Sequence, residues 1–263
     1  MKFLVILFGS AIVAAPAGAQ IDYRNLDHGR PTSVEDAYPV ERYGFELSAG
    51  YRHIGPSGQV RHLLVPELVY GFARGAHAAV RLPFVIPSGP STGSGGLAGA
   101  DLSVLLNLTT ERVALPGLAV RVDASLPVGG AGGRGSGLAL TGLATRSFGP
   151  RRAHLNASLA IDTPETPGGA EHLAHWWVGL AVDQTVIRQS TLLVGEAAVE
   201  SEQKGEPLRY FVGVGIRRQL TPTLVVDLGL GWEFERQTRT EPAVTVGLSH
   251  AFALEFLMPR GGR

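Results

Sequence analysis

Residues 224–235, LVVDLGLGWEFE, alternate between two kinds of side chain and set the expectation for the whole chain. One parity holds Leu224, Val226, Leu228, Leu230, Trp232 and Phe234, and the other holds mostly polar or small residues. Successive side chains of a β-strand point to opposite faces, so a sustained period of two predicts a strand rather than a helix. Strands of soluble sheets average about 5–6 residues, whereas a tilted strand needs about 9–11 to cross a membrane. This stretch is long enough to cross a membrane as a tilted strand.

The same alternation recurs from residue 41 almost to the end of the chain. It predicts twelve strands, at 41–53, 60–72, 76–86, 97–109, 117–127, 138–148, 152–162, 172–186, 190–200, 208–219, 223–235 and 243–254. Pro66 interrupts the second segment, and the alternation is blurred in the sixth. Strands joined in chain order predict an all-β, antiparallel, up-and-down sheet.

The connections between these segments fall into two classes. Those after the odd-numbered segments are mostly long and polar or rich in Gly and Pro, as at 87–96, 128–137, 163–171 and 200–207. Those after the even-numbered segments are mostly tight, near Arg74-Gly75, Gly149-Pro150, Arg188-Gln189 and Thr221-Pro222, and the stretch around Glu111 is the longest exception. Short periplasmic turns and longer outer loops produce this sorting in outer-membrane barrels.

The aromatic side chains give a separate indication. On the apolar parity they gather near the strand ends, at Tyr43, Phe45, Tyr70, Phe72, Phe148 and Phe252 on one rim and Tyr51, Phe84, Trp176, Tyr210, Trp232 and Phe234 on the other. Aromatic rings favour membrane–water boundaries, so the pattern predicts two girdles around a transmembrane barrel. Unpaired backbone groups cost several kcal/mol in lipid, so the last strand should pair with the first.

The N-terminus predicts export. Lys2 precedes an apolar stretch from Phe3 to Ala14, and Ala17-Gly18-Ala19 fits a cleavage site. An uncleaved anchor or a buried strand is the alternative. The expected organisation is a signal peptide at 1–19, a polar periplasmic leader at 20–40, an outer-membrane barrel at 41–256 and a tail at 257–263. Such a chain belongs in the outer membrane of a Gram-negative bacterium, with membrane lipids and the assembly machinery as partners.

The inward parity carries ionisable residues of both signs. We expect these to line the lumen: Glu46, Arg52, Glu67, Arg81, Asp101, Arg121, Asp123, Asp162, Asp183, Glu196, Arg217, Asp227 and Glu233. They indicate either a polar conduit that selects solutes or a lumen filled by paired charges. Barrels of about 8 strands are filled and those of about 16 carry water, so a twelve-stranded barrel allows both. A narrow route, gated by the leader or by loop 87–96, is favoured over a wide pore.

Other functions find little support in the sequence. The balanced formal charge gives no reason to expect nucleic acid, and the absence of cysteine excludes disulfides and thiolate metal sites. A lipid hydrolase is the enzymatic alternative, but His154, Asn156 and Ser158 share the inward parity, and the adjacent Ser249 and His250 face opposite ways. The eight histidines, His172 and His175 included, show no metal spacing. We therefore expect no enzyme, cofactor or metal.

Two stretches resemble known families. Val244-x-Val246-x-Leu248-x-His250-x-Phe252 resembles the C-terminal assembly signal of outer-membrane proteins, although eleven residues follow Phe252 and Leu254 and Phe256 continue the alternation. The stretch Asp22-Tyr23-Arg24-Asn25-Leu26-Asp27, with Gly29-Arg30-Pro31 and residues 35–43, resembles the start of transporter-like proteins related to the phenol meta-degradation pathway. That resemblance implies an outer-membrane protein linked to uptake of small, often aromatic molecules, and it supplies no catalytic residues.

These observations predict a barrel of about twelve strands, monomeric or oligomeric, that passes a small hydrophobic or aromatic solute. A structural or adhesive barrel without a pore is the alternative, followed by a lipid hydrolase.

Overall fold

The computed structural model describes residues 20–55, 61–87, 95–131, 135–162, 173–187, 189–201, 208–235 and 240–258. The predicted signal peptide and most of the predicted outer loops lie outside these residues, as does His172. Within the described part no helix is long and apolar enough to span a membrane.

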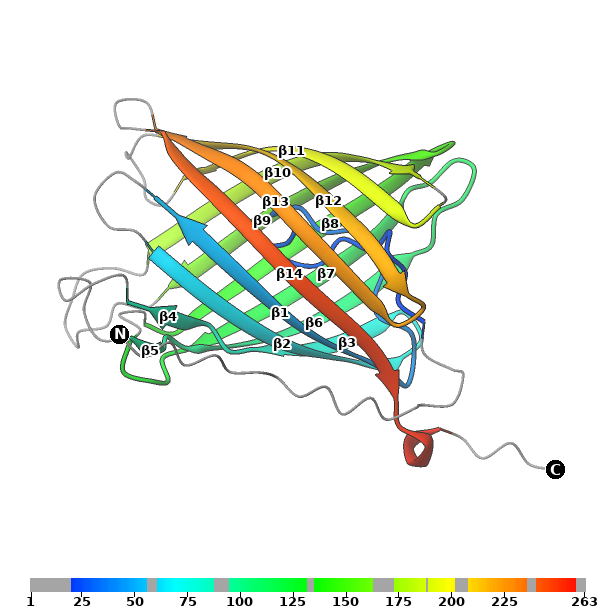
Figure 1. Cartoon of the computed structure of the whole chain (residues 1–263), viewed down its shortest axis with the longest axis horizontal. Helices are drawn as coiled ribbons and strands as arrows, with labels where there is room; N and C mark the ends of the chain where they lie inside the picture. Colours follow the sequence, from blue (N-terminus) through cyan, green and yellow to red (C-terminus); the bar gives the residue numbers. More distant parts are fainter. Residues whose placement is uncertain are drawn as a thin grey trace.

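The described chain is almost entirely β-structure (Figure 1). The strands are β1 (Gly44–Ile54), β2 (Arg61–Ala73), β3 (Ala76–Arg81), β4 (Phe84–Ile86), β5 (Gly96–Leu97), β6 (Ala100–Thr109), β7 (Gly117–Leu126), β8 (Gly137–Phe148), β9 (Arg151–Asp162), β10 (Leu173–Val186), β11 (Thr191–Ser201), β12 (Arg209–Thr221), β13 (Leu224–Glu235) and β14 (Glu241–Ala253). A short 3₁₀ helix, Glu255–Leu257, follows the last strand.

The sheet closes on itself as an antiparallel barrel. Strand β1 pairs with β2 on one side and with β14 on the other, and the remaining strands pair in chain order. Strands β3 and β4 both pair with β2, while β6 pairs with β3 and β5 with β4. Strands β3 and β4 are therefore two parts of one interrupted strand, and so are β5 and β6. Counted in this way, the barrel has twelve strands. The predicted fold is confirmed.

The interruptions have local causes. Pro83 separates β3 from β4 and has no N–H to donate to the ladder. Across from it, Gly99 separates β5 from β6 and takes a φ of 154°. The backbone remains connected here, because Leu82 N–H donates to Pro66 O (3.0 Å) and Ala98 N–H to Pro83 O (2.8 Å). The wall is irregular at this point without being open.

The first strand begins at Gly44, later than the predicted residue 41. Tyr43 has a φ of 67°, outside the β region, and its N–H donates to Gly71 O (2.6 Å). A side chain at position 71 would place its β-carbon 1.9 Å from Glu41 O, so only glycine allows the chain to cross β2 here. The turn redirects the chain from the barrel interior into the wall.

The two faces of the wall differ as the alternation predicts. Large apolar side chains stand exposed on the outer face, among them Leu47, Leu68, Leu159 and Leu230. Of the predicted rim aromatics, Phe72, Phe148, Trp176, Tyr210, Trp232 and Phe234 are exposed, and Phe45 stacks on Tyr70 and Phe252. A wide apolar exterior is unfavourable in water and favourable in lipid.

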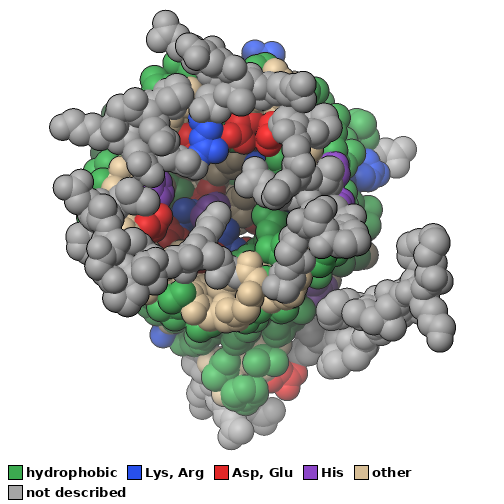
Figure 2. Space-filling view, turned by 90° about the vertical axis from the view of Figure 1, so that its left-hand side faces the viewer, with side chains coloured by type: hydrophobic (Ala, Val, Ile, Leu, Met, Phe, Trp, Pro, Cys, Tyr) green, Lys and Arg blue, Asp and Glu red, His purple; other side chains and the backbone are tan. Residues whose placement is uncertain are grey.

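The two ends of the barrel carry different connections. Tight turns at 74–75, 149–150 and 222–223 lie at one end, together with residue 44 and the end of β14, and we call this the turn end. It is the right-hand side of Figure 1. We call the opposite end, where β1 ends and β2 begins, the loop end. Figure 2 looks into the loop end, where acidic and basic side chains are visible inside the opening.

Candidate functional site: the lumen and its inner segment

Residues 20–43 lie inside the barrel, and we call them the inner segment (Figure 1). The segment enters at the turn end, where Ile21 N–H donates to Pro222 O (3.0 Å), and returns there at Tyr43. Its tip, around Pro31 to Ser33, lies deeper in the lumen, where Thr245 Oγ1 donates to Pro31 O (3.2 Å). Val34 and Ala37 are completely buried. The segment forms no strand with the wall, so side chains must satisfy its backbone.

Arginines and aspartates join the segment to β12, β13 and β14. Arg30 donates to Asp227 (2.9 Å), to Ser249 Oγ (2.9 Å) and, within the segment, to Asp27 (2.8 Å). Arg217 donates to the same Asp27 carboxylate (2.5 Å) and is 0% exposed. Opposite charges thus alternate between the segment and the wall. Buried charges are tolerated when they are paired in this way.

A second group of contacts holds Glu35. Its carboxylate pairs with Arg121 of β7, which also donates to Asp123 (2.9 Å). Its backbone is held by one side chain of β9, because Asn156 accepts from Glu35 N–H (2.8 Å) and donates to Glu35 O (2.9 Å). An amide side chain has both a donor and an acceptor, so it can replace the partner strand that this backbone lacks.

A third group lies on β8, β9 and β10. Arg152 pairs with Asp183 (2.6 Å) and with Asp36 of the inner segment (3.4 Å). His154 contacts Asp183 through Nε2 (2.9 Å) and Thr145 through Nδ1 (3.0 Å). An ionised carboxylate only accepts hydrogen bonds, so His154 donates to Asp183 through Nε2–H. Thr145 Oγ1, which contacts the other ring nitrogen, also accepts from Ala37 N–H (3.0 Å).

Three further side chains of the wall bond backbone groups of the inner segment. Glu196 of β11 accepts from the N–H groups of Ser33 (2.8 Å) and Val34 (3.2 Å). Asn107 donates to Ala37 O (2.7 Å), and His77 Nδ1 accepts from Val40 N–H (3.1 Å). The polar contacts to the inner segment therefore come from strands around much of the wall.

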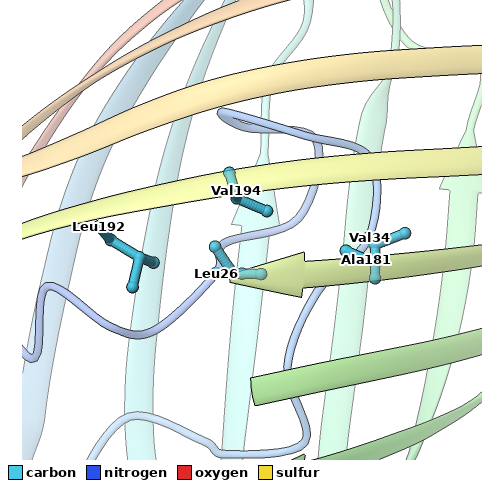
Figure 3. Close-up of a cluster of buried hydrophobic side chains, with 5 residues drawn as sticks. All are labelled: Leu26, Val34, Ala181, Leu192 and Val194. Atoms are coloured by element: carbon cyan, nitrogen blue, oxygen red, sulfur yellow. The ribbon is translucent and has the colours of Figure 1, made fainter. Parts of the chain in front are cut away.

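Apolar contact is limited to small patches. Figure 3 shows the largest, where Leu26 and Val34 of the inner segment lie near Ala181, Leu192 and Val194. A second patch joins Ala37 to three residues of the wall, and a third joins Ile21 to two. Tyr23 and Trp177 pack against the first patch, and Tyr23 also packs against the third. Among the described residues the three patches hold five, four and three buried side chains, and the hydrogen bonds and ion pairs above lie between them.

The segment leaves part of the lumen open. A cavity of about 410 Å³ lies at the turn end, lined by Arg24, Tyr38, Val40, Glu46 and Arg152 among others. A smaller one of about 50 Å³ shares Tyr38, Val40 and Glu46 with it and reaches Glu67 and His77. The larger cavity lies between the inner segment and residues of β1, β8, β9 and β14, and the smaller one reaches β2, β3, β6 and β7. Arg152 lines the larger cavity, whereas Arg30 lines neither.

Two carboxyls of the inner segment, which lies outside the spanning strands, have shifted pKa values because burial and neighbouring charges act on them in opposite directions. Burial raises the pKa of Glu35 to about 7, and the nearby carboxyls of Asp123, Asp36 and Glu67 add to the rise against the attraction of Arg121. Burial would also raise the pKa of Asp27, but Arg217 and Arg30 outweigh it and lower the value. Asp27 is therefore held ionised.

The predicted lumen residues lie at different places along the lumen. Arg81, Arg121, Glu196, Arg217 and Asp227 contact the inner segment, Arg81 through His28 (2.7 Å). Others pair along the wall, as Glu67 with Arg81, Asp101 with Ser125, Asp123 with Arg121, Asp183 with Arg152, Glu233 with Arg209, and Asp162 with His175. Glu46 lines both cavities, and Arg52 lies beside Glu196 nearer the loop end.

Of the residues weighed as hydrolase candidates, all but His250 face the lumen. His154 and Asn156 are buried against the inner segment, and Ser158 accepts from Thr141 (3.0 Å). Ser249 is buried inside while His250 is exposed outside. Among the described residues no group of three His, Cys, Asp or Glu side chains could hold a metal ion.

Several residues of the site were not singled out from the sequence. Asp27, Arg30, Glu35 and Asp36 of the inner segment take part in the ion pairs that join it to the wall. On the wall, Arg152 pairs with Asp36, and Thr145 accepts from Ala37 N–H. One signal was present: the otherwise non-periodic leader carries charges of both signs, as the inward faces of the strands do.

Comparison with known proteins bears on the fold. No family model matches the sequence, and no curated protein matches it. Among solved structures, an outer-membrane channel from Pseudomonas putida F1 aligns with a TM-score of 0.67 and 14% identity, over 86% of this chain and 100% of that one. The NanC porin aligns at 0.55 with 9% identity, over 78% and 98%, and the KdgM porin in complex with disordered oligogalacturonate at 0.50 with 9%, over 78% and 99%. The chain therefore has the fold of outer-membrane channel barrels.

Proposed function

We propose that this protein is a channel of the Gram-negative outer membrane that passes small hydrophobic or aromatic solutes, and that the inner segment gates it. The observation that carries the proposal is how the lumen is filled. A segment joined to the wall at one end occupies it, held mainly by hydrogen bonds and ion pairs. Water and ions can replace such contacts when the segment moves, whereas exposing a large apolar core would be costly.

The remaining space supports a small solute. Ligand sites of small molecules span about 300–1,000 Å³, and the cavity at the turn end holds about 410 Å³. Tyr38 and Val40 offer apolar surface there. Charged side chains of both signs surround it, Arg24 and Arg42 as well as Asp22, Glu41 and Glu46. This mixture suits a single aromatic ring that bears a carboxylate or hydroxyl group. The resemblance of residues 22–43 to transporter-like proteins of aromatic degradation agrees with this class.

A structural or adhesive barrel is the second candidate, and the same occupied lumen favours it. If the inner segment never leaves the lumen, the barrel spans the membrane without forming a pore. The two candidates differ in one measurable property, which is whether ions or solutes ever cross. In either case we propose that the assembly machinery inserts the barrel by reading its last strand.

Single-channel recording in planar bilayers tests the proposal. Arg30→Ala removes the contacts to Asp227, Ser249 and Asp27, so we expect open events to become several-fold more frequent than in the wild type. Arg151→Ala is the matched control, because Arg151 is exposed and donates to Gln184 alone among its described contacts. Silence of wild type and Arg30→Ala alike, with intact β-rich circular dichroism, would favour the structural barrel.

The solute class needs a separate measurement. Aromatic acids should enter liposomes that contain the protein and should reduce ion current from the turn side, whereas aliphatic sugars of similar size should do neither. If ions pass and aromatic acids neither block the current nor cross the membrane, the result supports a channel and contradicts the proposed solute class.

A further inference from the structure

Tyr51, His53 and His62 form a cluster on the outer surface of the barrel, away from the lumen. His53 of β1 and His62 of β2 are direct partners across the two strands, and Tyr51 lies two residues before His53. The parity of Leu47 and Leu68, which are exposed, places all three side chains on the outer face. All three are half-buried and lie near the loop end, where β1 ends and β2 begins.

Three potential ligand atoms gather in this cluster. His53 Nδ1 lies 3.3 Å from His62 Nδ1, and the Tyr51 hydroxyl lies 2.6 Å from the same His62 nitrogen. The two imidazole rings are 4.8 Å apart between centroids and are tilted by 40°. The two Nδ1 atoms and the Tyr51 oxygen therefore lie within reach of one ion.

Hydrogen bonding alone does not account for this arrangement. A neutral imidazole nitrogen has one lone pair or one proton, so His62 Nδ1 makes one good hydrogen bond. The short contact from the Tyr51 hydroxyl takes up that capacity, which leaves His53 Nδ1 close to a nitrogen already engaged. A shared cation resolves the conflict, because each nitrogen then directs its lone pair at the ion instead of at its neighbour.

The spacing fits a tetrahedral ion. Zn²⁺ binds histidine nitrogen at about 2.0–2.1 Å, so two such ligands at the tetrahedral angle lie about 3.4 Å apart. The observed separation of the Nδ1 atoms is 3.3 Å. The Tyr51 oxygen, now 2.6 Å from His62 Nδ1, would move away by roughly 0.8 Å to become the third ligand, which needs a rotation of an outer side chain.

We propose that Tyr51, His53 and His62 bind a divalent transition-metal cation, Zn²⁺ or Cu²⁺, on the outer face of the barrel. Imidazole ligands suit these ions, and a phenol that binds one does so as its phenolate. The fourth position faces outward and takes water or an oxygen atom of a lipid headgroup. The site requires no opening of the lumen and does not depend on the proposed channel.

Metal titration of the refolded, untagged full-length protein in detergent tests the site. Zn²⁺ binding is measured by calorimetry, and Cu²⁺ is used as a paramagnetic probe. We expect one ion per chain, a Cu²⁺ spectrum split by two nitrogens, and at least tenfold weaker binding in His53→Ala and in His62→Ala. Tyr51→Phe should weaken Zn²⁺ binding and leave both nitrogen couplings in the Cu²⁺ spectrum.

His250→Ala provides the matched control, because His250 is exposed on the same outer face and lies at the other end of the barrel. It should bind as the wild type does. Equal binding by the wild type and the double variant His53→Ala/His62→Ala would overturn the proposal, and so would a Cu²⁺ spectrum with one nitrogen. The variants change outer side chains, and circular dichroism checks that each barrel has refolded.

Discussion

At the scale of single residues, the lumen is a set of buried charges that depend on partners far away in the sequence. Arg30 and Asp227 are separated by 197 positions, and Glu35 and Arg121 by 86. Periodicity places Asp227 and Arg121 on the inward face but cannot say what they meet there. The partner residues lie in a stretch with no alternation, so no rule of strand geometry assigns them a direction.

Glu35 predicts a pH dependence of gating. When the inner segment is outside the lumen, the undocked state, the pKa of Glu35 has its ordinary value near 4.5. When the segment is inside, the docked state, burial and the carboxyls of Asp123, Asp36 and Glu67 raise this pKa to about 7 against the attraction of Arg121. The docked state thus holds the proton more tightly, so docking weakens as the pH rises from about 4.5 to about 7 and then levels off. Open probability should increase several-fold between pH 5 and pH 8.

Glu35→Gln provides the comparison for that measurement. Glutamine keeps the shape and cannot ionise, so bilayer recordings of this variant should show most of the pH dependence lost. A wild-type channel whose open probability falls as the pH rises would contradict the assignment.

At the scale of elements, the strands were predictable because membrane and lumen impose opposite demands on alternate residues. Even the segments weakened by Pro66 and by blurred alternation form β2 and β8, since pairing on both sides overrides local preference. The breaks at Pro83 and Gly99 were not predicted. The direction of residues 20–40 was left open between the lumen and the space below it, because a polar stretch fits both environments.

Leu230 offers a test of the outward face of β13. It lies near the middle of the strand and is 43% exposed, so it should meet the hydrocarbon core. Leu230→Arg should cost about 2–4 kcal/mol of folding free energy in lipid vesicles, the range for arginine at the midplane of a barrel. Denaturant titration monitored by tryptophan fluorescence measures this loss.

Val113→Arg is the control, since Val113 is 97% exposed on a connecting turn between β6 and β7 and should change stability by less than about 0.5 kcal/mol. If Leu230→Arg were equally harmless, the outer face would not be lipid-facing. The protein should also need detergent or lipid to remain folded in solution.

At the scale of the whole molecule, the wall and the inner segment supply each other's polar partners. The wall alone would leave Arg217 and Asp227 paired only with each other (3.6 Å) and Glu196 without the N–H groups of Ser33 and Val34, and the segment alone lacks the backbone partners of a strand. Together they form a closed structure whose contacts are mostly polar. Because the segment is joined to β1 at the turn end, it can leave the lumen without leaving the protein.

A reversible crosslink between segment and wall would show whether that movement opens the barrel. A β-carbon added at Gly179 would lie 2.7 Å from Val34 Cγ2, close to the separation of about 3 Å that a disulfide sets between one Sγ and the opposite Cβ. The same point lies 2.5 Å from the Trp177 ring, whose outer edge must turn aside. The chain has no native cysteine, so Val34→Cys with Gly179→Cys forms a single defined bridge.

In planar bilayers the oxidised double variant should conduct several-fold less than the same protein after reduction, while each single variant should be indifferent to the reductant. A bridge that forms fully, as shown by mass spectrometry, and leaves the current unchanged would mean that ions pass beside a fixed segment, through the two cavities that Glu46 lines. In that case Glu46 and Glu67, rather than movement of residues 20–43, would control the passage, and Glu46→Gln should alter the ratio of cation to anion current in the bridged protein.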